Sequence, residues 1–141
     1  MRLMRWNCKE KGKCFRNLCP KLGAFDDCFP GKIGMSDVDG VVELGGRFLF
    51  LEWKSPGGSL TTGQRITFQN LTSLSPDPMK VQVILVSGDP ETMDVFSVQV
   101  WSAGKAGDVV ECDLEGLKDR MTAWAARAQR CRQRPSERAD A

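Results

Sequence analysis

The sequence of 141 residues contains no histidine, so no metal site in this protein can use a histidine ligand. No run of apolar residues approaches the roughly 18 that a helix needs to cross a bilayer. The first nine residues lack the apolar region of a secretory signal peptide. The chain also has no internal repeat, no glycine-rich phosphate loop and no helix-turn-helix pattern. These absences predict an intracellular, cytoplasmic protein without a membrane segment.

Charge is distributed unevenly along the chain. The formal net charge is only +2, but residues 1–21 carry seven Lys/Arg against one Glu. Residues 118–141 carry seven Lys/Arg against three acidic residues, so the middle of the chain is acidic. Basic ends around an acidic centre suit an enzyme that grips nucleic-acid phosphates. Solvated termini with no such role explain the basic ends equally well.

The segment between residues 36 and 55 has the pattern of a β-hairpin. Two apolar runs flank Gly45-Gly46, a pair typical of a two-residue primed turn. This turn sets the register, which places Asp39 opposite Glu52 and Asp37 opposite Lys54. Directly opposed residues share one face of the sheet, with Cβ atoms about 5 Å apart.

Two opposed carboxylates destabilise a hairpin unless a cation lies between them. An ordinary exposed face explains Asp37 opposite Lys54 as a surface ion pair worth less than about 1 kcal/mol. It does not explain Asp39 opposite Glu52. Alternation places Glu52 and Lys54 on the same face as two phenylalanines, so these charges are expected to be partly enclosed. Oxygen ligands beside a lysine favour a Mg²⁺ site for phosphate chemistry.

This arrangement resembles the PD-(D/E)xK nuclease superfamily, in particular its VRR-type and RecB-type branches. Twelve residues separate Asp39 from the ExK element Glu52-Trp53-Lys54, and Gln64 begins a QxxxF element downstream. The matching stretch covers about residues 34–88. The resemblance implies a restriction-endonuclease-like α/β fold and a metal-dependent deoxyribonuclease. It also implies that Asp39, Glu52 and the Trp53 backbone carbonyl hold Mg²⁺ or Mn²⁺, that Lys54 assists the nucleophile or the scissile phosphate, and that Gln64 supports the site.

The sequence departs from the superfamily pattern at two points. Val38 stands where the family has a proline before the aspartate, and Asp37 is a second candidate metal ligand. Register and spacing both favour Asp39. The absence of histidine excludes variants of the family with an upstream histidine ligand. The rival hypothesis is a non-catalytic DNA-binding or adaptor module on a nuclease scaffold, and the intact Asp39, Glu52 and Lys54 set argues against it.

The N-terminal segment, residues 1–33, is basic and rich in cysteine. In an intracellular chain such a cluster is more typical of metal binding than of disulfides, which allows a structural Zn²⁺ site. The spacing lacks a CxxC pair, so separate buried or free thiols remain the alternative. The four cysteines are Cys8, Cys14, Cys19 and Cys28.

The rest of the chain predicts strands and helices in alternation. A helix is expected at about 60–74, with Gln64 on its inward stripe. Thr61-x-x-Gln64 also fits a capping box, so Gln64 has two candidate roles. Strands at 80–87, 94–101 and 108–112 and an apolar-striped helix at 114–131 follow. We therefore expect a mixed sheet of four or five strands flanked by helices.

The predicted domain organisation has three parts. The basic cysteine-rich segment occupies residues 1–33, the nuclease core residues 34–131, and a disordered basic tail residues 132–141. A small nuclease that cuts both strands of a duplex would need a symmetric homodimer. The stripe on the last helix is interpreted as core cover, and a dimer seam is the alternative.

Overall fold

The computed structural model describes residues 22–132, in two compact units that meet between Asp37 and Val38. The described part of the first unit contains η1 (Leu22–Cys28), a short 3-10 helix within the segment described above as basic and cysteine-rich. Three of the four N-terminal cysteines lie outside the described residues, as do residues 133–141 of the predicted tail. Arg132 is the last residue of the final helix.

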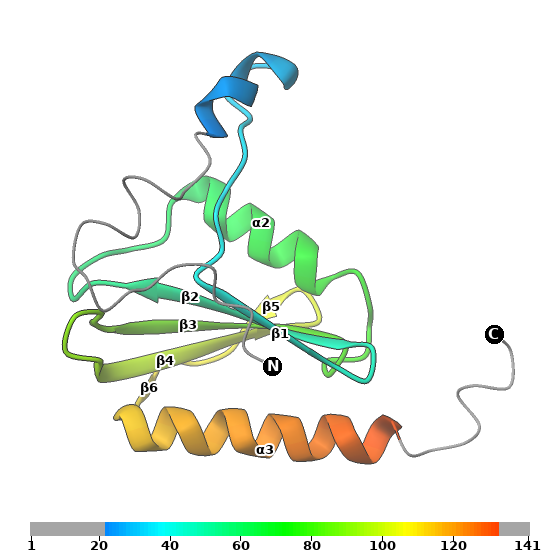
Figure 1. The fold of residues 1–141 in the computed structure, drawn as a ribbon, viewed down its shortest axis with the longest axis vertical. Helices are drawn as coiled ribbons and strands as arrows, with labels where there is room; N and C mark the ends of the chain where they lie inside the picture. Colours follow the sequence, from blue (N-terminus) through cyan, green and yellow to red (C-terminus); the bar gives the residue numbers. More distant parts are fainter. Residues whose placement is uncertain (1–21, 133–141) are drawn as a thin grey trace, which may run out of the picture. The chain divides into compact units, whose positions relative to one another are not determined.

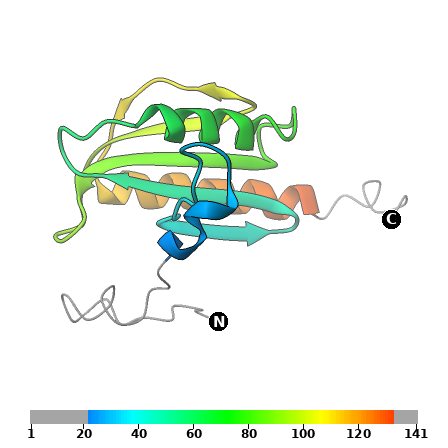
Figure 2. The ribbon, with the colours of Figure 1, turned by 90° about the horizontal axis from the view of Figure 1, so that it is seen from above.

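The described residues of the second unit form one mixed sheet of six strands covered by a helix on each face (Figure 1). The strand order is β1-β2-β3-β4-β5, and β6 pairs with β4. In Figure 2, β1 lies at one edge of the sheet, far from β5. The elements are β1 (Gly40–Leu44), β2 (Arg47–Lys54), α2 (Thr62–Thr72), β3 (Val81–Asp89), β4 (Asp94–Ser102), β5 (Lys105–Ala106), β6 (Val110–Glu111) and α3 (Leu114–Arg132).

This architecture confirms the predicted α/β class, with a mixed sheet flanked by helices. The two shortest strands bring the described sheet to six strands, and β5 had no counterpart among the predicted elements. None of the helices between residues 22 and 132 is long and apolar enough to cross a membrane.

The β1–β2 hairpin has the predicted turn and register. Gly45 and Gly46 have φ angles of +61° and +82°, which L-residues with a Cβ rarely adopt. Strand pairing runs from Leu44 opposite Arg47 to Gly40 opposite Leu51. From β2 the chain passes through α2 into β3, which lies parallel to β2, as the strand-helix-strand pattern predicted.

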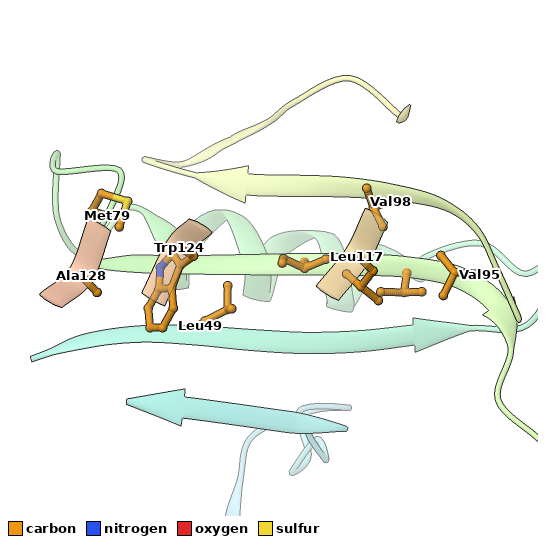
Figure 3. Close-up of a cluster of buried hydrophobic side chains, with 9 residues drawn as sticks. Leu49, Met79, Val95, Val98, Leu117, Trp124 and Ala128 are labelled. Carbon is orange, nitrogen blue, oxygen red and sulfur yellow. The ribbon is translucent and has the colours of Figure 1, made fainter. Parts of the chain in front are cut away.

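The core lies in two clusters, one on each face of the sheet. The larger cluster packs α3 against the sheet, and its Trp124 lies beside Leu49 of β2 (Figure 3). The smaller cluster packs α2 against the other face through Phe68, Val83 and Trp101. The predicted stripe of α3 is core cover, since all its members belong to or pack against the larger cluster: Leu114, Leu117, Met121, Trp124 and Ala128.

Candidate active site

Asp39 lies at the open end of the hairpin, directly before β1. The pairing with β2 stops at Gly40 and Leu51, so no residue of β1 lies opposite Trp53. The carboxylate of Asp39 takes that place, because its Oδ2 accepts a hydrogen bond of 2.7 Å from the Trp53 backbone N–H. A strand residue points its N–H and C=O to the same side. The Trp53 carbonyl therefore faces the same edge as Asp39.

The predicted pairs, Asp39 opposite Glu52 and Asp37 opposite Lys54, are not part of the hairpin ladder. Asp39 does not extend the ladder opposite Glu52 but binds the backbone of the next residue. Asp37 belongs to the first unit, outside the hairpin, so its predicted strand pairing with Lys54 is not part of this ladder. The ladder could be predicted from the turn, but the place where it ends could not.

Glu52 lies on the face of β2 that α2 covers. Its side chain is only 15% exposed, and its Oε1 lies 3.6 Å from Nζ of Lys54, which is itself 21% exposed. The same oxygen accepts a hydrogen bond of 3.2 Å from Nε2 of Gln64. The predicted enclosure of these two charges is therefore present. Their attraction is screened less by solvent than that of a surface pair.

Gln64 makes the contacts of both roles that the sequence left open, the capping box and a bond to the candidate site. Thr61 is the N-cap of α2, and its Oγ1 accepts a hydrogen bond of 3.1 Å from the Gln64 backbone N–H. The Gln64 side-chain Oε1 accepts a bond of 3.1 Å from the Thr61 N–H, which completes the capping box. An amide side chain also carries two N–H donors, which leaves Nε2 for Glu52. The start of α2 and the position of Glu52 are thus coupled through one side chain.

The donor set of this site fits a hard divalent cation. Residues 22–132 contain no group of three or more Cys, Asp or Glu side chains placed to hold a metal. The candidate ligands are therefore fewer: the carboxylates of Asp39 and Glu52 and the backbone carbonyl of Trp53. Mg²⁺ prefers oxygen ligands and keeps several waters, so it needs only one or two protein carboxylates. Asp39 and Glu52 are the carboxylates that could serve as these ligands, one bound to the Trp53 N–H and the other to Gln64.

Two further contacts made by residues of β2 were not predicted. The indole Nε1 of Trp53 donates a hydrogen bond of 2.8 Å to the carbonyl of Gly88, which lies in β3, one residue beyond the strand predicted at 80–87. Arg47, at the other end of β2, is 3% exposed and lies 3.6 Å from Asp77. A buried arginine directly after the Gly-Gly turn gave no sequence signal, because its partner is thirty residues away.

An apolar groove lies elsewhere in the second unit, between β1, β2 and α3. Its volume is about 470 Å³, and Val42, Leu44, Met121 and Trp124 are among its lining residues. Glu43 is the one ionisable residue on its wall. The groove therefore lacks the paired carboxylates and the lysine that phosphate chemistry needs.

The cysteines of the described region are not joined in disulfides. Cys28 is exposed, and Cys112 and Cys131 are half-buried. Because Cys8, Cys14 and Cys19 lie outside the described residues, the zinc site remains a prediction.

Comparison with known proteins decides the family. The model of the VRR-NUC domain matches residues 4–88, which is more than half of the chain. The chain belongs to the VRR-NUC domain family. This family consists of PD-(D/E)xK-like nuclease domains, so the predicted resemblance is confirmed. The match to the VRR-NUC domain contains Asp39, Glu52, Lys54 and Gln64, and it ends at Gly88. No curated protein and no solved structure matches the chain.

Proposed function

We propose that this nuclease-type DNA-processing domain is a metal-dependent deoxyribonuclease that hydrolyses phosphodiester bonds at Asp39, Glu52 and Lys54. The observation that carries the proposal is the convergence of two distant segments on the Glu52-Trp53-Lys54 stretch. Asp39 binds the Trp53 amide from the start of β1, and Gln64 binds Glu52 from the start of α2. Both contacts place polar groups at the same end of β2.

The metal ligands in this proposal are the carboxylates of Asp39 and Glu52 and the backbone carbonyl of Trp53. Bound Mg²⁺ or Mn²⁺ would activate water and stabilise negative charge on the leaving oxygen. The protein's own part is to keep the two carboxylates apart and in place. Asp39 is held by the Trp53 amide, and Glu52 is held by Gln64 and Lys54.

Lys54 supplies the positive charge of the site. Its ammonium group lies 3.6 Å from Glu52 and is partly enclosed, so it acts on a nearby phosphate with little screening. An ammonium is a point charge with three donors, which suits a phosphate oxygen or an attacking water. Lys54 would orient the water and neutralise the scissile phosphate.

A cleavage assay with Mg²⁺, Mn²⁺ or EDTA on linear, circular and branched DNA tests the proposal. We expect cleavage with either metal and none with EDTA. Asp39→Ala should abolish cleavage while the protein stays folded, and Asp37→Ala should have a smaller effect. Cleavage that survives EDTA, or is lost with Asp37→Ala but kept with Asp39→Ala, would refute the proposed site.

The alternative function is DNA binding without catalysis. It predicts that the wild-type protein shifts DNA in a gel but cleaves none of the three substrates at any metal concentration. The enclosed Glu52–Lys54 pair supports catalysis instead, because simple DNA binding gives no reason to hold a carboxylate beside the lysine that meets the phosphate.

Three further expectations accompany the proposed nuclease. Cleavage of both strands would involve a homodimer, which light scattering of the purified protein would detect. Residues 1–21 would grip DNA phosphates, so their deletion should weaken binding and flatten its salt dependence. A structural zinc on the N-terminal cysteines would appear as about one zinc per chain by metal analysis.

A further inference from the structure

Trp53 contacts three parts of the second unit through its two N–H groups and its ring. Its backbone N–H donates to Asp39, and its indole Nε1 donates to the Gly88 carbonyl at 2.8 Å. Its ring packs against the larger core cluster, on the α3 face of the sheet. Trp53 is therefore bound both at the open end of the hairpin and at the end of β3.

Gly88 is held in place by the neighbouring strand. The pairing of β3 with β4 shifts between Ser87 and Gly88, which marks a β-bulge. A Cβ atom on Gly88 would lie 2.1 Å from the backbone oxygen of Asp94, far inside van der Waals contact. The strands approach so closely that only glycine fits here. The carbonyl that accepts the indole bond thus belongs to a bulge where β4 lies directly against the backbone of β3.

The other tryptophans of the described region bury their indole N–H groups differently. Nε1 of Trp101 and of Trp124 are buried without a hydrogen-bond partner within residues 22–132. Both rings serve the two core clusters by packing. The hydrogen bond of Trp53 is therefore no general consequence of burying a tryptophan in this fold.

We propose that Trp53 is a positioning residue for the metal site, acting through its indole bond to Gly88. The inference rests on the proposed nuclease function. The bond fixes the rotation of the last residues of β2 about the strand axis. That rotation aims the Trp53 N–H at Asp39 and the Trp53 carbonyl at the proposed metal position. Loss of the indole donor loosens two of the three proposed ligands, the Asp39 carboxylate and the Trp53 carbonyl. The Trp53 side chain itself would touch neither metal nor substrate.

The test compares Trp53→Phe with Trp101→Phe and Trp124→Phe. All three variants lose an indole from packed surroundings and should lower the melting temperature. Only Trp53→Phe loses a hydrogen bond found in the described structure. We expect it to need three- to tenfold more Mg²⁺ for half-maximal cleavage, about the effect of one hydrogen bond. Its KM for DNA at saturating Mg²⁺ should match that of the controls.

A second measurement uses the folded wild-type protein. If the indole bond supports metal binding, metal binding must support the indole bond by the same free energy. Hydrogen exchange of the Trp53 indole N–H, followed by NMR, should therefore slow when Mg²⁺ is added. The Trp101 and Trp124 indoles should slow only as far as they exchange by unfolding of the whole domain, which bound metal also opposes. The chain has four tryptophans, so Trp6→Phe is added to the three variants, and the signal of one variant that fails to fold is then assigned by elimination.

The outcomes separate this inference from the proposed function. A wild-type protein that responds to Mg²⁺ neither in melting temperature nor in cleavage refutes the proposed function itself. A wild-type protein that does respond, together with equal Mg²⁺ requirements in Trp53→Phe and Trp101→Phe, overturns the positioning role alone. Unchanged exchange of the Trp53 indole at saturating Mg²⁺ would overturn it as well.

Discussion

The two faces of the sheet differ in what their helices cover. On one face, α3 (19 residues) contributes Leu117, Trp124 and Ala128 to a cluster of nine buried residues. On the other, α2 (11 residues) contributes Phe68 to a cluster of three. The shorter helix begins beside Glu52, so the apolar layer on its face stops where the charged end of β2 starts. The α3 face stabilises the fold, and the α2 face leaves part of the sheet to polar groups.

Trp53 connects the two faces. Its neighbours Glu52 and Lys54 point to the α2 face, whereas its own ring packs on the α3 face. The alternation of a β-strand thus gives the Glu-x-Lys stretch two charged residues on one side and an anchor on the other. The comparison teaches that the candidate site has its charged groups on the α2 face and is anchored by Trp53 on the apolar α3 face.

The sharpest contrast is expected in catalysis. Glu52→Gln keeps the shape of the side chain but removes its charge, and Lys54→Ala removes the cation. Each should lower the cleavage rate by about a thousandfold or more, since the loss of a charged group at such a site costs several kcal/mol in the transition state. Single-turnover cleavage at saturating Mg²⁺ measures this.

Lys118→Ala is the matched control for the lysine variant. Lys118 lies on α3, is 61% exposed, and pairs only with its helical neighbour Glu115 in the described structure. We expect cleavage by Lys118→Ala to stay within about twofold of wild type, because a surface pair contributes little. Similar losses in Lys118→Ala and Lys54→Ala would mean that both lysines act through general attraction of DNA.

The second contrast concerns stability. Leu117 of α3 is 3% exposed in the larger cluster, whereas Leu71 of α2 is half-buried at the margin of the smaller one. Leu117→Ala should lower the free energy of unfolding by about 2–5 kcal/mol, the range for fully buried leucines. Leu71→Ala should lower it less. Urea denaturation measures both, and an equal or reversed ranking would show that the two faces contribute alike.

The third contrast separates the metal-free site from the metal-bound site. Asp39→Asn keeps an oxygen that can accept the Trp53 N–H but removes a charge near Glu52. Without metal, its melting temperature should not fall below that of wild type. When Mg²⁺ is present at a hundred times its Kd, the free energy of unfolding of the wild type should rise by about 2.7 kcal/mol, and that of Asp39→Asn should hardly change. Equal Mg²⁺-induced shifts in both proteins would exclude a metal site built on Asp39.

Local sequence patterns predicted much of this molecule because their causes are local. The glycine pair at the turn determines the hairpin register, and apolar spacing identified the buried stripes of α2 and α3. The capping box and the inward position of Gln64 were both visible in sequence. The capping role and the site role stay alternatives in the sequence, because a sequence does not show that the Gln64 amide binds both Thr61 and Glu52.

The features that escaped prediction depend on contacts between distant segments. The hairpin ladder ends at Gly40, which moves Asp39 from a strand position to the Trp53 amide. Gly88 lies one residue beyond the strand predicted at 80–87. In the structure it belongs to β3 because it pairs with Val95 of β4, and its carbonyl accepts the indole bond of Trp53. Neither contact has a signature in the spacing of the residues involved.

The smallest expected effects separate the two roles of Gln64. Thr61→Ala removes the capping oxygen but keeps the amide that binds Glu52, and it should cost about 1 kcal/mol of stability with cleavage nearly unchanged. Gln64→Glu keeps a residue that completes a capping box, so its melting temperature should be close to that of wild type. It replaces the N–H donor with a carboxylate facing Glu52, so cleavage at saturating Mg²⁺ should fall by about tenfold, the effect of one charge-assisted hydrogen bond. If Thr61→Ala loses as much activity as Gln64→Glu, the site depends on the start of α2 as a whole, and the Glu52 contact has no separate role.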